Sequence, residues 1–324
     1  MKAALCNTLS GPAGLEITDI PVPEPKSGQA LVTVKAVGLN FADTLITRGK
    51  YQYKPDLPFA PGAEIAGIIE RIEGETHGLR PGQRVMAYVG WGGAAEHIAV
   101  ATDKLVPVPD GVSDTIAAGL SVTYGTALHG LAERGRLTAG ETVVVTGAAG
   151  GAGLAAVEIA GLMGGRVIAV ASTPEKLEVA RNAGASEGIL YPGTDLKLAV
   201  RELTGGAGAD VVYDCIGGDA AEPLIRALAW KGRFLVVGFA AGEIPRIPLN
   251  LLLVKGAEAT GVFWGESVQR DPAGHRAGMA RVLDWVAQSR LHPRTHGTFP
   301  LEQIGAALGV LDARAAQGKV VLTL

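Results

Sequence analysis

A glycine-rich turn follows a short apolar strand and runs directly into a helix-forming stretch. The strand and the turn together read ETVVVTGAAGGAG over residues 141–153, and the helix-forming stretch LAAVEIAGLMGG follows them. Small residues at Ala148 and Gly150 would let the backbone approach a pyrophosphate, and Gly153 would let the helix pack tightly on the strand. The free N–H groups at the start of such a helix attract an anion. The turn therefore predicts dinucleotide binding, although its spacing is A-x-G-x-x-G, and a glycine turn that only packs well is the alternative.

The end of the next expected strand, RVIAVAS, indicates which dinucleotide would bind. An acidic residue there would hold the ribose hydroxyls of NAD. Ser172 and Thr173 stand at this place instead, and Lys176 lies one helical turn further on. Hydroxyls and a cation suit a 2′-phosphate, so these residues favour NADPH, with Glu175 as the one opposing charge. On the other interpretation, Lys176 is a solvated residue of a helix surface.

The cysteines and histidines do not form a metal-binding pattern. Cys6 and Cys215 are the only cysteines, so neither a disulfide framework nor a cysteine-rich zinc site is expected. Six histidines are scattered along the chain, and His292 and His296 have helical spacing but are separated by Pro293. We expect these two to be loop residues. Cys215 ends a buried-looking strand and is expected to be an inert thiol.

Residues 140–264 alternate between short apolar runs and helical stretches. The strand-like runs are ETVVVTGA, RVIAVAS, EGILY, ADVVYDCIG, GRFLVVGF and AEATGVFWG, and the helices between the earlier ones are LAAVEIAGLMGG, PEKLEVARNAG, DLKLAVRELTGG and AEPLIRALAW. Strands that are apolar on both faces and alternate with helices indicate a parallel sheet covered on both sides. Gly164 and Gly184 stand where helix C-caps are expected, and Pro174 stands where a helix begins.

The rest of the chain has a different texture. Residues 1 to about 120 are rich in strand-forming residues and Pro-Gly turns, and the prolines at 21, 23 and 25 predict an extended edge or a loop. Two helices are expected between residues 272 and 316, before the strand-like end KVVLTL. That last strand needs a sheet to join, and the first region offers one. We therefore expect a split domain, 1–122 with 265–324, and an inserted domain at 123–264.

Length and composition limit the class of protein. The chain has 324 residues, which suggests two domains at roughly 150 residues each. It is 48% hydrophobic and 19% charged with a net charge of −3, as in soluble globular proteins. The sequence has no basic stripe, which argues against nucleic acid as a partner. It also has no apolar stretch of about 18 residues, which argues against a membrane span. The beginning has no signal-peptide pattern, so we expect a cytoplasmic protein.

Several segments resemble the medium-chain dehydrogenase/reductase superfamily, and within it the zinc-free NADPH:quinone oxidoreductases related to ζ-crystallin. These segments are VGLNFADTLITRGKY, LPFAPGAEIAGIIERIEG, GGAAEHIAV, VTGAAGGAGLAAVEIA and GRFLVVGFAAGEIPRIPLNLLLVKGAEATGVFWG. The resemblance covers nearly the whole chain. It implies an α/β fold in which a Rossmann doubly wound parallel sheet, binding NADPH, is inserted in a β-rich GroES-like catalytic domain.

The resemblance also implies the loss of a metal. The zinc alcohol dehydrogenases of this superfamily carry C-x-[ST]-D and G-H-E, where this chain reads Asn40-Phe41-Ala42-Asp43 and Gly62-Ala63-Glu64. Without the cysteine and the histidine, a tetrahedral catalytic zinc is not expected. Asp43 and Glu64 are then expected to orient turns. Alcohol oxidation needs an acid for the alkoxide, whereas hydride addition to an activated carbonyl compound needs less help.

By resemblance, Asn40 and Tyr51 line the nicotinamide and substrate cleft and are the candidate catalytic residues. Asn40 would donate from its amide and Tyr51 from its phenol. The alternatives are that Asn40 only holds a backbone turn and that Tyr51 only packs. Trp91 and Trp264 are candidates for the mouth of the substrate site. The cofactor-binding residues expected from the turn and the resemblance are Asn40, Thr126, Ala148, Gly150, Gly151, Ala152, Gly153, Ser172, Thr173, Lys176, Tyr191, Phe239, Phe263, Arg314 and Lys319.

The function implied by the resemblance is hydride transfer from NADPH to a small-molecule quinone or α,β-unsaturated carbonyl compound. A second hypothesis is an enoyl or acrylate-type reductase for a small conjugated acid or thioester, with Arg48 and Lys50 attracting the anion. A third is an NADPH-binding protein with little catalysis, crystallin-like or RNA-binding. Family members are commonly homodimers or homotetramers, and AEATGVFWG is compatible with a sheet edge that continues across subunits.

Overall fold

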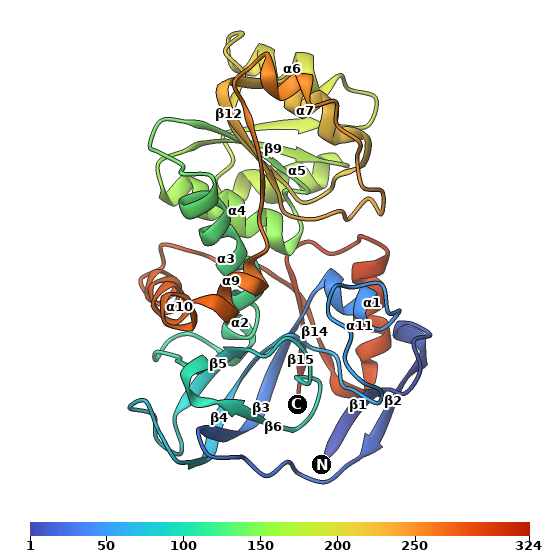
Figure 1. The fold of residues 1–324 in the computed structure, drawn as a ribbon, viewed down its shortest axis with the longest axis vertical. Helices are drawn as coiled ribbons and strands as arrows, with labels where there is room; N and C mark the ends of the chain where they lie inside the picture. Colours follow the sequence, from blue (N-terminus) through green and yellow to red (C-terminus); the bar gives the residue numbers. More distant parts are fainter. The chain divides into compact units, whose positions relative to one another are not determined.

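The computed structural model describes residues 1–324 and divides them into two compact units (Figure 1). Unit 1 consists of Met1–Val122 and Gly265–Leu324, and unit 2 consists of Thr123–Trp264. The chain therefore leaves unit 1 once, builds unit 2 and returns to complete unit 1.

Unit 1 contains a large mixed sheet and a separate sheet of two strands, β1 and β2. The path through the main sheet is β14-β15-β3-β4-β5-β7, and β6 pairs with the first half of β3. The strands are β1 (Lys2–Cys6), β2 (Leu15–Asp19), β3 (Gln29–Leu39), β4 (Glu64–Glu73), β5 (Arg84–Tyr88), β6 (His97–Ala101), β7 (Val106–Pro107), β14 (Thr295–Pro300) and β15 (Lys319–Thr323). No strand covers residues 20–28, so of the two alternatives for the proline run, an extended edge or a loop, the structure has the loop.

The strand β15 confirms the expectation that the end of the chain joins the sheet of the first region. It pairs antiparallel with β3, and Val320 lies opposite Leu39. This register brings Lys319 beside Asn40, the residue after Leu39. On the other side of β3, Gly38 lies opposite Glu64 of β4. Three segments distant in sequence are thus joined at one point of the sheet.

The helices of unit 1 cover the sheet and connect its strands. Ile304, Ala307 and Leu308 of α11 are buried in one core with Val320 and Leu322 of β15. The two helices expected between residues 272 and 316 are present as α10 and α11, whereas α9 was not expected. The helices are α1 (Phe41–Ile46), α2 (Asp114–Ala117), α9 (Trp264–Arg270), α10 (Pro272–Ala287) and α11 (Ile304–Asp312), with 3-10 turns at Pro12–Gly14, Thr102–Lys104 and Leu301–Gln303.

Unit 2 has the parallel sheet that the alternation of strands and helices predicted. Its order is β10-β9-β8-β11-β12-β13, and every neighbouring pair is parallel. The chain runs one way through β8, β9 and β10, then the other way through β11, β12 and β13, which is a doubly wound topology. The strands are β8 (Thr142–Thr146), β9 (Arg166–Ala171), β10 (Glu187–Leu190), β11 (Ala209–Asp214), β12 (Leu228–Val236) and β13 (Glu258–Gly261).

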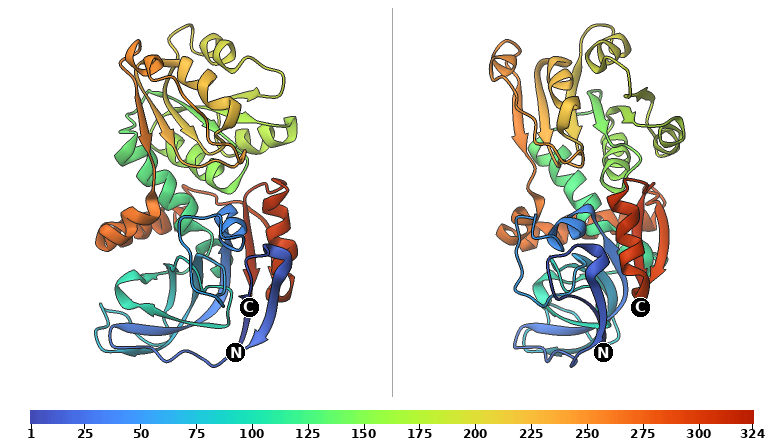
Figure 2. Two further views of the ribbon diagram at one scale, coloured as in Figure 1. Left: turned by 45° about the vertical axis from the view of Figure 1, so that its right-hand side comes forward. Right: turned by 90° about the vertical axis from the view of Figure 1, so that its right-hand side faces the viewer.

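Helices lie on both faces of this sheet (Figures 1 and 2). Because parallel crossovers are right-handed, α4 and α5 lie on one face, and the reversal at β11 places α7 on the other. Residues of α6, α7 and α8 share one core with β8 to β12. The helices are α3 (Leu120–Leu128), α4 (Gly151–Leu162), α5 (Pro174–Asn182), α6 (Leu196–Leu203), α7 (Ala221–Arg226) and α8 (Asn250–Leu253), with a π-helical turn at His129–Arg134 and a 3-10 turn at Gly218–Ala220.

Most of the expected helix ends are confirmed, and one boundary is corrected. Pro174 is the first residue of α5, and Gly164 and Gly184 have φ angles of 83° and 106°, as C-cap glycines do. The stretch AEPLIRALAW is not one helix, because α7 ends at Arg226 and β12 begins at Leu228. Leu228 pairs with Ala209 of β11, so tertiary strand pairing overrides the helical preference of this segment.

No helix of the molecule combines the length and the apolar composition that crossing a bilayer requires.

Two glycines of α4 give a matched test of the helix packing. A Cβ on Gly153 would collide with the backbone carbonyl of Gly147, whereas nothing lies within 4 Å of a Cβ on Gly161. We expect Gly153→Ala to lower the free energy of unfolding by about 1–3 kcal/mol, because backbone must move to admit the methyl group. Gly161→Ala should raise it by about 0.5–1 kcal/mol through helix propensity. Urea unfolding measures both, and equal effects of the two changes would contradict the packing argument.

Candidate functional site

The glycine-rich turn of unit 2 folds back on itself between β8 and α4. Gly147 has a φ angle of 60°, and its carbonyl accepts the N–H of Gly150 at 2.9 Å. Helical bonding begins with the N–H of Leu154, which donates to the carbonyl of Gly150 at 2.8 Å. The N–H groups of residues 151–153, from Gly151, Ala152 and Gly153, therefore precede the helical ladder and are available to an anion.

The ends of β8 and β11 are tied together beside this turn. The hydroxyl of Thr146 donates to Asp214 at 2.6 Å, and Asp214 also accepts the N–H of Gly217 at 3.2 Å. A Cβ on Gly147 would come within 2.9 Å of the Ile216 side chain. This place is the topological switch point of the sheet, where open α/β proteins bind ligands. Ala148 lies fully buried in the turn.

The residues expected to hold a 2′-phosphate gather at the ends of β9 and β10. Lys176 Nζ donates to the hydroxyl of Ser172 at 3.3 Å. The hydroxyl of Thr173 caps α5, accepting the N–H of Lys176 at 3.3 Å. Tyr191 is exposed and its N–H donates to the carbonyl of Ala171, which ends β9. A cation and a hydroxyl are thus grouped at the end of β9, and the backbone of Tyr191 lies next to this end.

The other expected residues of unit 2 have varied surroundings. Thr126 is half-buried in α3, Phe263 is exposed, and Phe239 packs against Gly217. Trp264 is buried against Gly125, so it is not an open lining residue of unit 2. Cys215 is a free thiol whose pKa is raised by burial and by Asp214, which is the direction that an inert side chain requires.

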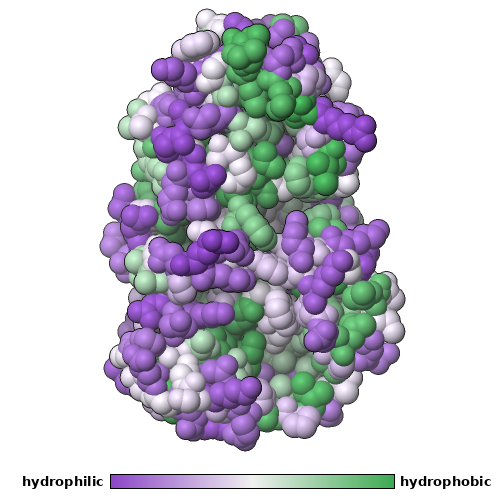
Figure 3. All heavy atoms as spheres, in the orientation of Figure 1, coloured by the Kyte–Doolittle hydropathy of each residue, from purple (hydrophilic) through white to green (hydrophobic).

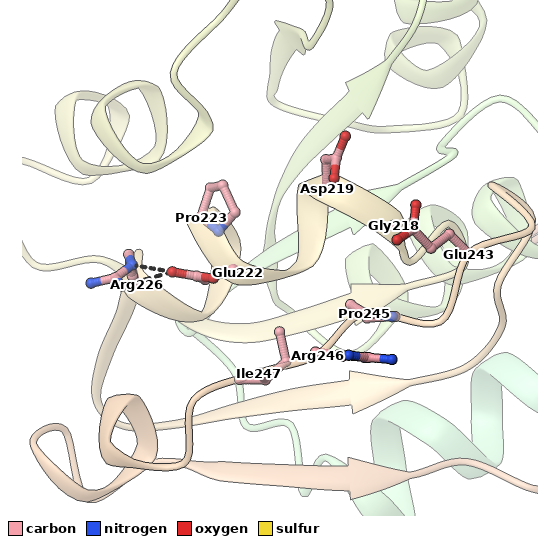
Figure 4. Close-up of a pocket in the computed structure, with 9 residues that line it drawn as sticks. All are labelled: Gly218, Asp219, Glu222, Pro223, Arg226, Glu243, Pro245, Arg246 and Ile247. Atoms are coloured by element: carbon pink, nitrogen blue, oxygen red, sulfur yellow. Dashed lines mark hydrogen bonds and ion pairs between the residues drawn. The ribbon is translucent and has the colours of Figure 1, made fainter.

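A polar hollow of about 290 Å³ lies elsewhere in unit 2 (Figure 4). The ion pair of Arg226 with Glu222 crosses one side of it, with nitrogen and oxygen 2.7 Å apart. It contains none of the residues expected to bind cofactor. Its lining residues are Gly218, Asp219, Glu222, Pro223, Arg226, Glu243, Pro245, Arg246 and Ile247.

In unit 1, Asp43 fastens the turn that carries Asn40. Asn40 is the N-cap of α1, and its N–H donates to Asp43 Oδ2 at 2.7 Å. Asp43 Oδ1 accepts the N–H of Gly62 at 2.9 Å. Burial raises the pKa of Asp43 to about 6, against the lowering by these two N–H groups and by Lys319.

Glu64 and Lys319 form a buried ion pair beside Asn40. Glu64 is fully buried, and the side chain of Lys319 is 8% exposed. Glu64 Oε2 accepts the N–H of Val122 at 2.8 Å, and Glu64 Oε1 pairs with the ammonium of Lys319. The sequence interpretation placed Lys319 near cofactor phosphates. Its ammonium instead has two partners in unit 1, Glu64 and Asn40, which a phosphate would have to displace.

The ion pair fixes the orientation of the Asn40 amide. Lys319 Nζ donates to Asn40 Oδ1 at 2.6 Å, and Asn40 Nδ2 donates to Glu64 Oε1 at 3.0 Å. An ammonium only donates and a carboxylate only accepts. With the amide turned round, its NH2 group would face the Lys319 ammonium and its oxygen would face the Glu64 carboxylate, so neither hydrogen bond could form. A weaker contact of 3.4 Å joins Nδ2 to the carbonyl of Gly38. Both N–H groups of this amide therefore have a partner, and the one that donates to Gly38 has the weaker hydrogen bond.

Gly38 makes room for this arrangement. A Cβ at this position would collide with the carbonyl of Ala118 and would come within 2.9 Å of the Glu64 carboxylate. A side chain on Gly38 would therefore push Glu64 away from its position beside Lys319.

A cluster of aromatic side chains also lies in unit 1. The rings of Tyr51 and Tyr53 meet edge to face, with centroids 5.8 Å apart, and Tyr53 lies 6.4 Å from Trp91. Tyr88, the last residue of β5, pairs across the ladder with Glu64. Burial raises the pKa values of Tyr51, Tyr53 and Tyr88. Tyr53 and Tyr88 were not among the expected site residues; the strand-end position of Tyr88 is the one sequence signal that pointed to it.

The remaining basic and histidine residues of unit 1 have other surroundings. Arg48 forms an ion pair with Asp312 at 2.5 Å. Arg314 follows α11 in an exposed position with a φ angle of 55°. His296 lies in β14 and not in a loop as expected, and its Nδ1 accepts the N–H of Gln317 at 3.2 Å. No three His, Cys, Asp or Glu side chains in the molecule lie together in a way that could hold a metal ion.

Removing the cation of the buried pair should cost more stability than removing the whole pair. We expect Lys319→Met to lower the free energy of unfolding by about 3–5 kcal/mol, because it leaves the Glu64 charge buried without its partner. Adding Glu64→Gln to that variant should recover most of the loss, since no unpaired charge remains. Urea unfolding of the two single variants and the double variant measures the coupling. Additive losses would show that the two charges do not stabilise each other.

The raised pKa of Asp43 predicts a pH dependence. Its carboxyl has an ordinary pKa of 3.8 in the unfolded chain and about 6 in the fold. Between these values the folded protein holds a proton that the unfolded chain has released, so this group's contribution to stability falls as the pH rises through the window. Carbon NMR of aspartate-labelled protein should show one carboxyl titrating near pH 6, absent from Asp43→Asn. A carboxyl titrating below pH 4 would contradict the desolvation argument.

Comparison with known proteins gives the same family along the whole chain. Residues 26–110 match the profile of the alcohol dehydrogenase GroES-like domain, and residues 151–287 match that of the zinc-binding dehydrogenases. The chain is 39% identical to quinone oxidoreductase-like protein 2 of Rattus norvegicus, over 100% of this chain and 92% of that protein.

Solved structures agree. A mycobacterial protein crystallised with NADPH superposes with a TM-score of 0.93 at 31% identity, covering 100% of both chains. The quinone oxidoreductase of Thermus thermophilus, also solved with NADPH, has a TM-score of 0.87 at 36% identity, again over 100% of both chains. The chain therefore belongs to the quinone oxidoreductase family of the medium-chain dehydrogenase/reductase superfamily.

Proposed function

We propose that this protein is a zinc-independent, NADPH-dependent reductase that transfers a hydride to a quinone or an α,β-unsaturated carbonyl compound. The observation that carries this proposal is the state of the residues at the zinc-ligand region of the superfamily. Asn40, Asp43 and Glu64 are held by hydrogen bonds to the chain and by the ammonium of Lys319. The positive charge beside Glu64 is thus the ammonium of Lys319, a group of the chain itself.

NADPH fits the residues of unit 2. The turn at residues 147–153 excludes side chains at Gly153 and leaves helix N–H groups for a pyrophosphate. Ser172 and Lys176 stand together for a 2′-phosphate, and the two relatives solved with NADPH support this choice. When bound, NADPH supplies a hydride, which with one solvent proton converts a quinone to a hydroquinone or an enone to a saturated ketone.

The chain's own residues would orient and polarise the acceptor. The phenol of Tyr51 is one donor for an acceptor oxygen that gains negative charge, and the Asn40 N–H that is only weakly bonded to the Gly38 carbonyl is the other. Because burial and nearby charges raise the pKa of Tyr51, its hydroxyl stays protonated and donates. The final proton comes from solvent in this scheme.

The enoyl-acid alternative has less support from the fold. Arg48, one of the two basic residues offered for an anionic substrate, is paired with Asp312. An acid or thioester substrate would have to compete with that carboxylate.

We also propose that the protein is a homo-oligomer formed through unit 2. The strand β13 is an edge of the parallel sheet, and large apolar side chains of β12, of the segment between β12 and β13, and after β13 are exposed. Figure 3 shows hydrophobic surface gathered over the upper part of unit 2. The exposed side chains are Trp230, Ile244, Leu249, Leu253, Val254 and Phe263. Light scattering after size exclusion tests this, with Leu253→Glu expected to yield monomers.

The function is tested by following NADPH oxidation with 1,2-naphthoquinone, 1,4-benzoquinone, crotonyl and methyl vinyl ketone acceptors, with and without EDTA. Acceptor-dependent oxidation that EDTA does not change supports the proposal, and the relative rates rank quinone against enone. NADPH binding without reduction of any acceptor would overturn it and favour a binding protein. Loss of activity in EDTA would overturn the zinc-independent part.

The preference for NADPH should depend on Lys176. We expect Lys176→Ala to raise the Kd for NADPH by about tenfold and to leave that for NADH unchanged, because only NADPH carries the 2′-phosphate. Lys197→Ala, on α6 of the same unit, is the control for general loss of positive charge. Fluorescence titration gives the constants, and an equal loss for both cofactors would contradict the assignment.

A further inference from the structure

A buried carboxylate at the end of β11 has no part in the proposed hydride transfer. Asp214 is the last residue of the strand and is 2% exposed. Its side chain accepts the Thr146 hydroxyl at 2.6 Å, the N–H of Ile216 at 3.0 Å and the N–H of Gly217 at 3.2 Å. None of these partners carries a positive charge. Because a buried carboxylate without a cation is costly, the hydrogen bonds that it accepts are its main stabilising interactions.

These hydrogen bonds hold the turn that follows β11. The Thr146 hydroxyl, at the end of β8, accepts the N–H of Cys215 at 3.0 Å while it donates to Asp214. Together with the two N–H groups bound by Asp214, three successive N–H groups of residues 215–217 are held by side chains. The turn after β11 is therefore fixed by one side chain from each of two neighbouring strands, β8 and β11.

The same turn lies against the glycine-rich turn of unit 2. A Cβ on Gly147 would come within 2.9 Å of Ile216 Cδ1, so the Ile216 side chain occupies the space beside this glycine. The carbonyl of Gly147 accepts the N–H of Gly150 and lies against Gly153 at the start of α4. A displacement of Ile216 would therefore displace Gly147 and the first N–H groups of α4.

We propose that Asp214 and Thr146 are positioning residues for the pyrophosphate of NADPH. They hold Ile216 against Gly147, and through this contact they fix the N–H groups of residues 151–153. This inference rests on the proposed NADPH-dependent function and adds two side chains that act through the backbone. Because Asp214 acts by accepting hydrogen bonds, its acceptor oxygens should matter more than its charge.

The test compares two ligands that differ in the pyrophosphate. NADPH carries it, whereas 2′-AMP has the adenosine and the 2′-phosphate alone. We expect Thr146→Val to raise the Kd for NADPH about tenfold and to change that for 2′-AMP less than about twofold. Thr146→Ser keeps the hydroxyl and should bring the Kd for NADPH back to within about threefold of wild type. Calorimetric titration gives all of these constants, and unchanged binding of NADPH by Thr146→Val would overturn the proposal.

Thr204→Val is the matched control at the other end of β11. The Thr204 hydroxyl also joins two backbone groups, since it donates to the carbonyl of Val200 at 2.8 Å and accepts the N–H of Gly208 at 2.9 Å. Its loss leaves the glycine-rich turn untouched, so we expect NADPH to bind as in wild type. Equal losses of NADPH affinity in Thr146→Val and Thr204→Val would show a general effect on unit 2 and overturn the proposal. Equal losses for NADPH and 2′-AMP in Thr146→Val would do the same.

Two changes at Asp214 separate its charge from its hydrogen bonds. Asp214→Asn keeps one acceptor oxygen and removes the charge, whereas Asp214→Leu removes both. We expect Asp214→Asn to bind NADPH within about threefold of wild type and Asp214→Leu to lose about tenfold or more. If Asp214→Asn lost as much as Asp214→Leu and still bound 2′-AMP, the charge would carry the effect and the positioning role would fail. The Thr146 variants decide the question alone if Asp214→Leu does not fold.

These titrations contain no acceptor, so they separate this inference from the proposed reaction. If the protein binds NADPH and reduces no acceptor, and Thr146→Val loses NADPH affinity selectively, the reductase proposal fails and the positioning role stands. If the protein reduces a quinone or an enone and Thr146→Val binds NADPH as tightly as wild type, the reductase proposal stands and the positioning role fails.

Discussion

A lysine ammonium buried against a fully buried carboxylate constrains much of unit 1. Transfer of either charge from water is costly, so Lys319 and Glu64 can remain inside only together and with every other polar atom satisfied. Asn40 and the N–H of Val122 provide that satisfaction, and Gly38 provides the space. The pairing of β15 with β3 follows from the same requirement, because a slip of one residue would turn the lysine to the opposite face. The same interactions of Lys319 and Glu64 therefore stabilise this part of unit 1 and fix the geometry of the candidate site.

Unit 2 depends on a different constraint, the close approach of backbone to backbone. Gly147 adopts a left-handed conformation and Gly153 lies against its carbonyl, so the first turn of α4 rests directly on the end of β8. The hydrogen bonds from Thr146 and Gly217 to Asp214 tie the neighbouring strand to the same place. The Asp214 carboxylate is occupied by these hydrogen bonds, and the N–H groups at the start of α4 are the electrostatic feature left for a ligand. A negatively charged ligand is the natural complement of such a turn.

The parts of this molecule that could be predicted from sequence are those with local signals. The alternation of apolar runs and helices indicated the parallel sheet of unit 2, and prolines and glycines marked the ends of its elements. Long-range partners were less accessible: nothing in DARAAQGKVVL indicates that Lys319 meets a carboxylate 255 positions earlier. The proximity of Tyr53 and Tyr88 was not predicted for the same reason, because their hydroxyls approach each other at Gly265 only in the folded chain. The boundary between α7 and β12 was misplaced because a pairing with β11 decided it.

The distance along the chain between Glu64 and Lys319 has a consequence for synthesis. A ribosome adds about 5–20 residues per second, so the carboxylate is made roughly 10–50 s before its cation exists. During that interval the strands around Glu64 cannot close without burying a lone charge, whereas all of residues 123–264 are synthesised before Lys319. Unit 2 can thus fold while unit 1 is still incomplete. The synthesis of Lys319 sets the time after which unit 1 can exclude water from Glu64.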